Sequence, residues 1–194
     1  MKRGALLFLL GAVAVSGPAS AQTNTTPALY RLNPDSSFEQ GCFPPCMCPV
    51  MITQPVMGTF LLTPTGFDGL FNTYAVTDVN WVVVIGGTAT TVSGGGTYRV
   101  GGEVALLQEL ALDLQVGGSK LAHFDSGLVA DSVSFPNIAV AISTNGQVCF
   151  DTVFDVRASP VPWPELHVAL ASASTIAVSW AVSATSDSVS LNTG

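Results

Sequence analysis

Residues 109–116 read Glu-Leu-Ala-Leu-Asp-Leu-Gln-Val, so a large apolar residue occupies every second position. Successive side chains of a β-strand point to opposite faces, and the large apolar residues would therefore share one face. These residues are Leu110, Leu112, Leu114 and Val116. A helix is the competing interpretation, but it would place Asp113 on the same stripe as Leu110 and Leu114. The alternation therefore predicts a strand whose leucines face a core.

A second alternating pattern lies further along the chain, on both sides of a turn signal. Its inward positions would be Ile138, Val140, Ile142, Val148, Phe150, Thr152, Phe154 and Val156. The pair Asn145-Gly146 separates the two halves, and Asn-Gly is typical of a tight hairpin turn. This segment is predicted to be a β-hairpin.

Further strands are expected at 29–32, 56–63 and 97–100, in a long run at 70–84, and as two short candidates at 166–170 and 175–182. The glycines at 94–96 lack the lysine and the following helix of a phosphate-binding loop, so they are interpreted as a turn. Many short strands separated by Gly- or Asn-rich turns indicate an all-β fold. We expect an antiparallel β-sandwich, jelly-roll or immunoglobulin-like, with a β-barrel as the second choice.

The N-terminus has the features of a secretory signal. Lys2 and Arg3 precede an apolar run at 5–15, and Ala19-Ser20-Ala21 supplies the small residues of a cleavage site. A retained membrane anchor is the alternative, but the apolar run is shorter than the ~20 residues of a span. The expected organisation is a signal peptide at 1–21, a disulfide-stapled β domain at 22–158, a proline-rich linker at 159–165 and a short, incomplete β tail at 166–194.

Charge limits the classes of partner. Cleavage after Ala21 removes Lys2 and Arg3 and changes the formal net charge from −7 to −9. The few remaining cations cannot form a basic patch, which argues against nucleic acid and anionic membranes as partners. No membrane span is expected in the mature chain. An extracellular protein, a polysaccharide or a lipid remains open as the partner.

Four cysteines, Cys42, Cys46, Cys48 and Cys149, predict two disulfides in an exported chain. A bridge between Cys46 and Cys48 would span a single residue and would be strained. Cys149 is therefore expected to pair with Cys46 or Cys48, and Cys42 with the other. The alternative is a zinc or iron–sulfur site of four thiolates, but the usual two-residue spacing is absent.

No residue pattern indicates catalysis or a cofactor, and the protein is expected not to be an enzyme. His123, Asp125 and Ser126 suggest a triad, but on a strand His123 and Asp125 point the same way while Ser126 begins a turn. Asp151 and Asp155 are expected as solvated side chains or as an ion pair with Arg157. The tryptophans are interpreted as core or linker anchors rather than as a sugar-binding platform. They are Trp81, Trp163 and Trp180.

Several motifs resemble known families. The Gly-Cys-Phe-Pro-Pro-Cys-Met-Cys-Pro motif at 41–49 resembles that of a family of uncharacterised secreted bacterial β-domain proteins, as do segments 58–60, 98–103, 123–128 and 149–153. This resemblance implies an extracellular β domain without an assigned activity. Residues 30–37 and 58–60 are similar to periplasmic polyisoprenoid-binding barrels, which would imply lipid binding. The tail from 175 to 185 is similar to the start of a bacterial immunoglobulin-like C-terminal module.

The expected function is that of a non-enzymatic secreted or envelope-associated β domain with a structural or interaction role. The alternative is a β-barrel carrier for a lipid or another small molecule. A packed interior would favour the first function, and a cavity of ~300 Å³ or more would favour the second.

Overall fold

The computed structural model describes residues 26–162, 165–172 and 175–181, with side chains described up to residue 162. The predicted signal peptide at 1–21 lies outside the described residues. The described part contains strands and connections without a helix, which confirms the all-β prediction. The strands are β1 (Ala28–Leu32), β2 (Ser37–Phe43), β3 (Met51–Phe67), β4 (Phe71–Ile85), β5 (Thr88–Gly101), β6 (Leu107–Val116), β7 (Ala122–Asp125), β8 (Val129–Ala130), β9 (Ile138–Ser143), β10 (Cys149–Pro160), β11 (Glu165–Ser172) and β12 (Thr175–Ala181).

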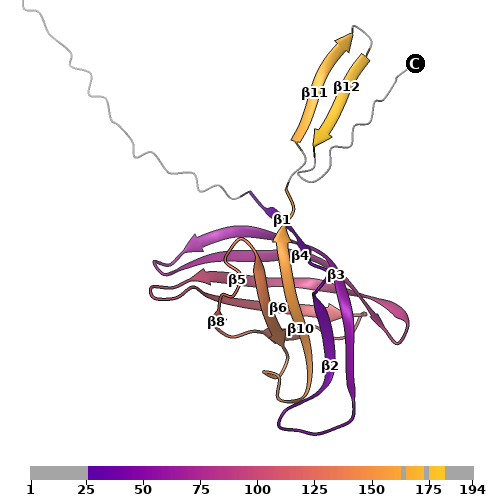
Figure 1. Cartoon of the computed structure of the whole chain (residues 1–194), viewed down its shortest axis with the longest axis vertical. Helices are drawn as coiled ribbons and strands as arrows, with labels where there is room; N and C mark the ends of the chain where they lie inside the picture. The colour runs from indigo at the N-terminus through magenta and orange to yellow at the C-terminus, as the bar shows by residue number, and fades with distance from the viewer. Residues whose placement is uncertain (1–25, 163–164, 173–174, 182–194) are drawn as a thin grey trace, which may run out of the picture.

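Ten strands form one antiparallel sheet whose pairing returns on itself (Figure 1). The order around it is β10, β2, β3, β4, β5, β6, β7 and β9, and β9 pairs again with β10. The pairing of β7 with β9 is limited to Asp125 and Ser143. This ring of strands is consistent with both expected architectures, the β-sandwich and the β-barrel.

Strands β1 and β2 share one position in the ring, because each pairs with β10 on one side and β3 on the other. The chain is interrupted between them, and Ser36 lies buried at the interruption. Its hydroxyl donates to the Arg157 carbonyl at 2.8 Å and accepts from the Arg157 N–H at 3.1 Å. The Val56 N–H donates to the Ser36 carbonyl. The backbone groups of Arg157 and Val56 that face the interruption therefore have hydrogen-bond partners on Ser36, as buried polar groups require.

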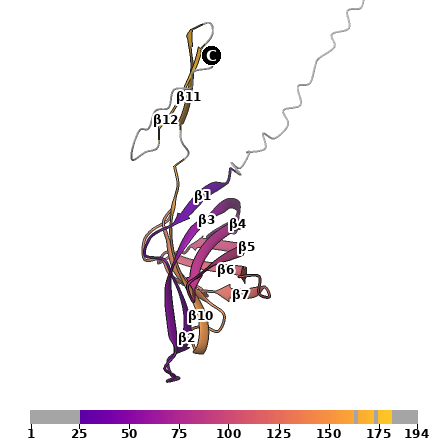
Figure 2. The same cartoon turned by 90° about the vertical axis from the view of Figure 1, so that its right-hand side faces the viewer.

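The ring has two parts, seen best in Figure 2. Strands β2 and β10 run together toward the lower end of the view, while β4, β5, β6 and β7 lie across the other part. Strand β3 belongs to both, since its first residues pair with β2 and the rest pair with β4. We call the part formed by β2 and the first halves of β3 and β10 the arm.

Strand β6 confirms the prediction for residues 109–116. It begins two residues earlier, at Leu107, and lies between β5 and β7. Leu110, Leu112 and Leu114 are fully buried, and Val116 is half-buried at the strand end. The inward face also carries Gln108, which accepts a hydrogen bond from the Tyr98 hydroxyl and donates to the Ala139 carbonyl. The alternation of large apolar residues therefore identified the buried face of β6 correctly.

The interior of the ring is filled by aromatic side chains from several strands. Trp81 of β4 is fully buried, with its ring centroid 5.6 Å from that of Phe154 and 6.2 Å from that of Phe60. Phe154 also contacts Phe38 at 5.2 Å and Phe124 at 5.3 Å. These tilted and edge-to-face contacts are the arrangements that aromatic rings prefer. The core is a packed aromatic cluster rather than an empty lumen.

The glycines at 94–96 are not a turn, as the sequence suggested, but the middle of strand β5. A Cβ at Gly94 would lie 2.0 Å from the Asp113 carbonyl oxygen, and one at Gly96 would lie 2.0 Å from the Ala111 carbonyl oxygen. Glycine is needed because the β6 backbone approaches too closely for a side chain. The predicted strand at 97–100 is therefore only the end of a longer strand.

Two other expectations require correction. Val148 and Phe150 continue the apolar alternation of the hairpin, yet both are exposed, Val148 just before β10 and Phe150 at its start. Ser159 and Pro160, assigned to the linker, belong to β10 and pair with Arg31 and Tyr30 of β1. The antiparallel pairing of β9 with β10 on either side of Asn145-Gly146 is confirmed, but the connection is longer than the tight turn expected, because the last paired residues are Ser143 and Val153.

Strands β11 and β12 pair with each other in a separate two-stranded sheet. Their bounds agree with the strands expected at 166–170 and 175–182. Residues 182–194 of the predicted tail lie outside the described residues.

Candidate functional site

Both disulfides lie at the end of the arm. Cys42 is bonded to Cys48, and Cys46 is bonded to Cys149, with Cα–Cα distances of 5.6 and 4.8 Å. The structure thus contains the expected two disulfides and selects Cys46 over Cys48 as the partner of Cys149. All four sulfurs are engaged in disulfides, so they do not form the alternative thiolate metal site.

Strand register brings the cysteines together. Cys149, the first residue of β10, is paired with Phe43 at the end of β2, and Gly41 is paired with Met51 at the start of β3. The Cys42 N–H donates to the Val50 carbonyl at 3.0 Å. A Cβ at Gly41 would lie 2.2 Å from that same carbonyl oxygen, and φ at Gly41 is +155°, so glycine is required there. The loop is thus held to the arm by both backbone and sulfur.

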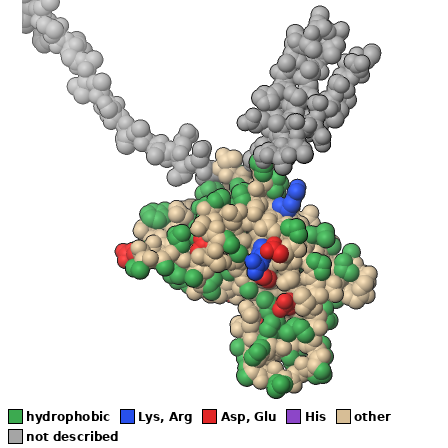
Figure 3. All heavy atoms as spheres, in the orientation of Figure 1, with side chains coloured by type: hydrophobic (Ala, Val, Ile, Leu, Met, Phe, Trp, Pro, Cys, Tyr) green, Lys and Arg blue, Asp and Glu red, His purple; other side chains and the backbone are tan. Residues whose placement is uncertain are grey.

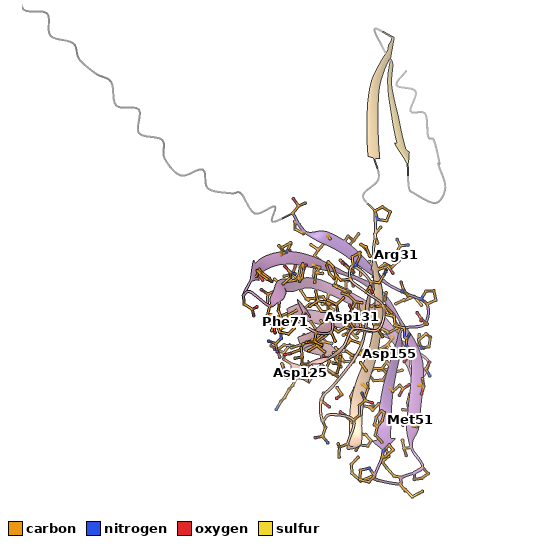
Figure 4. All side chains as sticks on the ribbon, turned by 60° about the vertical axis from the view of Figure 1, so that its left-hand side comes forward. Arg31, Met51, Phe71, Asp125, Asp131 and Asp155 are labelled. Atoms are coloured by element: carbon orange, nitrogen blue, oxygen red, sulfur yellow. A yellow bond between two sulfur atoms is a disulfide. The ribbon has the colours of Figure 1, made fainter. Side chains whose placement is uncertain are left out.

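The end of the arm exposes apolar side chains instead of covering them. We call residues 42–51 together with residues 148–150 the stapled tip. Met47 is fully exposed, and Phe150 is 61% exposed. The other exposed apolar side chains of the tip are Val50, Met51 and Val148. Figure 4 places Met51 near the lower end of the molecule, and Figure 3 shows hydrophobic side chains gathered there.

The stapled tip also lacks charge. Residues 40–67 contain no Lys, Arg, Asp, Glu or His, and neither do residues 132–150. In Figure 3 the charged side chains on the visible face lie above the tip. The tip is therefore an uncharged apolar surface on an otherwise acidic protein.

Asp151, which follows the tip in β10, is buried at 2% exposure, although the sequence analysis placed it in solvent or in an ion pair. Its Oδ1 accepts hydrogen bonds from the N–H and the hydroxyl of Thr144, and its Oδ2 accepts one from the Gln147 N–H at 2.7 Å. Burial raises the pKa of the carboxyl, but these hydrogen bonds outweigh burial and hold the pKa below its ordinary value. Asp151 thus stabilises the β9–β10 turn that leads to Cys149. The expected ion pair is formed by Asp155 and Arg157, 3.1 Å apart.

Replacing Asp151 with asparagine should lower the free energy of unfolding by about 1.5–3 kcal/mol at neutral pH, the range for hydrogen bonds to charged groups. The amide would turn a donor toward the Gln147 N–H in place of the acceptor Oδ2. Because the folded-state pKa is lowered, the carboxylate contributes stability above the unfolded-state pKa and loses it as pH falls through the folded-state pKa. Urea unfolding can be measured from neutral pH to below about pH 4. The unsubstituted protein should lose the contribution of Asp151 to the free energy of unfolding over this range, and the Asp151→Asn variant should not. Asp35→Asn, at an exposed carboxylate, is the control, and equal effects of the two substitutions would contradict the role given to Asp151.

The His123 segment does not form a triad. His123 Nδ1 lies 2.8 Å from Asp113 Oδ1, and its Nε2 lies 3.9 Å from Asp125 Oδ2. The Ser126 hydroxyl donates to the Gly127 carbonyl in its own turn and accepts from the Leu110 N–H of β6, so it is engaged by backbone groups on both sides. His123 is therefore bracketed by two exposed carboxylates and is not hydrogen-bonded to the serine.

An apolar pocket of 270 Å³ opens beside the arm. Inward side chains of β6 and β7 line it, with uncharged polar groups of the arm and the β9–β10 turn. The residues are Phe38, Gln40, Ile85, Leu114, Val116, Ser119, Ala122, Phe124, Thr144 and Thr152. Larger depressions of 360 and 590 Å³ lie over outward-facing positions, such as Asp155 and Arg157 in the first and Thr59 and Leu61 in the second. The 270 Å³ pocket is mostly apolar and is lined by the core side chains of Phe38, Leu114 and Phe124.

Trp81 is a core residue, as expected, whereas Trp163 and the side chain of Trp180 lie outside the described residues. Among the described side chains, no group of three or more His, Cys, Asp or Glu residues is arranged to hold a metal ion. No helix in the described part is long and apolar enough to span a membrane.

Neither protein-family models, nor curated proteins, nor solved structures yield a match to the chain. The candidate site is therefore defined by geometry alone, and the stapled tip and the pocket are its two parts. Sequence reasoning found the cysteines but missed the tip as a surface. Its signal was the long uncharged run from residue 40 to residue 67, which contains exposed Met47, Val50 and Met51.

Proposed function

We propose that the protein is an exported, non-enzymatic β domain of the extracellular space or cell envelope with an interaction role. The observation that carries this proposal is the gathering of five exposed apolar side chains at the uncharged stapled tip, beside an interior that is filled. Trp81 and Phe154 occupy the middle of the ring, where a carrier would keep a lumen. Monomeric proteins rarely expose grouped apolar side chains without a binding purpose.

Export is supported by two independent features. Residues 1–21 have the pattern of a signal peptide. The two disulfides are of the kind that persists in oxidising compartments outside the cytoplasm. The resemblance of the 41–49 motif to secreted bacterial β-domain proteins agrees with this location.

A second candidate is the small-molecule carrier, and the apolar pocket favours it. Its 270 Å³ is close to the lower limit of about 300 Å³ for ligand sites. Leu114, Phe124 and Val116 could contact an apolar group, while Gln40 and Thr152 could bind an uncharged polar group. We rank the carrier second because the aromatic cluster blocks continuation of the pocket through the ring.

Isolation of the protein from its producing cells tests the proposal. We expect exported protein that begins at Gln22 and, in native mass spectrometry, has the mass of the chain with two disulfides and no bound small molecule. An adduct of constant mass that is lost on denaturation would favour the carrier instead. Cytoplasmic protein that begins at Met1 and carries free thiols would overturn the export proposal.

A further inference from the structure

The stapled tip has the properties of a preformed docking element. Its exposed apolar side chains come from three places in the chain, namely Met47 in the loop, Val50 and Met51 before and in β3, and Val148 and Phe150 beside Cys149. The two disulfides and the Cys42–Val50 hydrogen bond hold these segments together. A rigid element loses little conformational freedom on binding, so little of the free energy gained by burying its apolar side chains is offset by ordering.

The charge distribution limits what can cover the tip. The tip has no charged side chain, and the nearest carboxylate along β10, that of Asp151, is buried against the backbone of its own turn. An ionic partner would gain nothing from this surface. The occupant must itself be uncharged and apolar where it meets Met47 and Phe150.

The area of the tip argues against a second copy of the chain. A standard protein interface buries about 800 Å² on each partner. Five side chains, most of them only about half exposed, offer on the order of a few hundred Å². The tip also projects from the end of the arm, and two projecting tips meet over a small area (Figure 2). A deformable apolar medium requires no complementary shape.

We propose that the stapled tip inserts into the interfacial region of a lipid bilayer with zwitterionic headgroups. Met47, Val50 and Phe150 would enter the boundary between headgroups and acyl chains, as the apolar faces of peripheral membrane proteins do. Anionic lipids are disfavoured, because the mature chain has a formal net charge of −9 and the tip has no cation. This inference rests on the proposed interaction role and names its partner.

Sedimentation with phosphatidylcholine vesicles tests the inference on the disulfide-bonded chain. We expect binding to these vesicles, no tighter binding when phosphatidylserine is added, and a loss of about tenfold in affinity for Met47→Asp, because a carboxylate resists transfer into lipid. Val104→Asp is the matched control, since Val104 is equally exposed but lies in the loop between β5 and β6. Val50→Asp provides a second tip variant, and equal thermal midpoints of all variants establish that each is folded.

Absence of binding to the vesicles, or equal losses for Met47→Asp and Val104→Asp, would overturn the inference. Sedimentation equilibrium gives the competing outcome, a dimer that Met47→Asp dissociates, and this would assign the tip to a second copy. In either case the interaction role would stand, because that role fails only if the protein is not exported or carries a ligand.

Discussion

Replacement of both Cys46 and Cys149 with serine should lower the free energy of unfolding by about 4–5 kcal/mol, from the loop-closure entropy of the unfolded chain. This disulfide joins residues 103 apart, so its loss frees most of the ring in the unfolded state. It also releases the loop that carries Met47 from the start of β10. Urea unfolding under non-reducing conditions, followed by tryptophan fluorescence, would measure the loss.

The second disulfide provides a matched control. Cys42 and Cys48 are six residues apart, and the same relation gives about 2 kcal/mol for replacing both with serine. The two double variants remove equal numbers of sulfur atoms from the same tip. If they lost equal stability, the bridges would act mainly through local packing, and the role given to the long loop would be wrong.

Leu112→Ala should lower the free energy of unfolding by about 2–5 kcal/mol, through lost burial and the residual cavity. Leu112 is 0% exposed and is paired with Gly96 of β5 and Phe124 of β7. Gly96 has no side chain that could move into the vacated space, which places the expected loss in the upper part of the range. Chemical denaturation monitored by circular dichroism would give the value.

Asp113→Ala is the control on the opposite face of the same strand. Asp113 is largely exposed, and its contact with His123 is a surface pair, so the loss should stay within about 0.5 kcal/mol. Similar losses at Leu112 and Asp113 would contradict the inward orientation of the leucines. A Leu112 loss at the low end, together with a bound adduct in native mass spectrometry, would favour the carrier.

The local parts of this structure could be predicted from the sequence. The alternation at 109–116 predicted the buried leucines of β6, and Asn145-Gly146 predicted the β9–β10 turn. The cysteine spacing reduced the disulfides to two arrangements, one of which is present. Each prediction depends on residues close in sequence or on the simple geometry of a bridge.

The errors at Val148, Phe150 and Asp151 share a cause: an alternating pattern shows which side chains share a face of a strand but not what packs on that face. Val148 and Phe150 continue the pattern of Phe154, yet both are exposed while Phe154 is fully buried. Asp151 appeared to be solvated, but the β9–β10 turn folds over it and surrounds the carboxylate with donors. Strand β2, which the sequence analysis did not anticipate, exists because β10 and β3 supply partners on both sides.

The sequence by itself determined that this protein is built of strands and that its cysteines form two disulfides. It also located the connection between β9 and β10 at Asn145-Gly146. Only the tertiary structure decided that the glycines at 94–96 lie inside β5, that Cys46 pairs with Cys149 and that the apolar tip is exposed. These features depend on which backbones, distant in sequence, approach one another. A strand pattern limits the faces of one segment, whereas burial is a property of the neighbours that the ring of pairings brings to it.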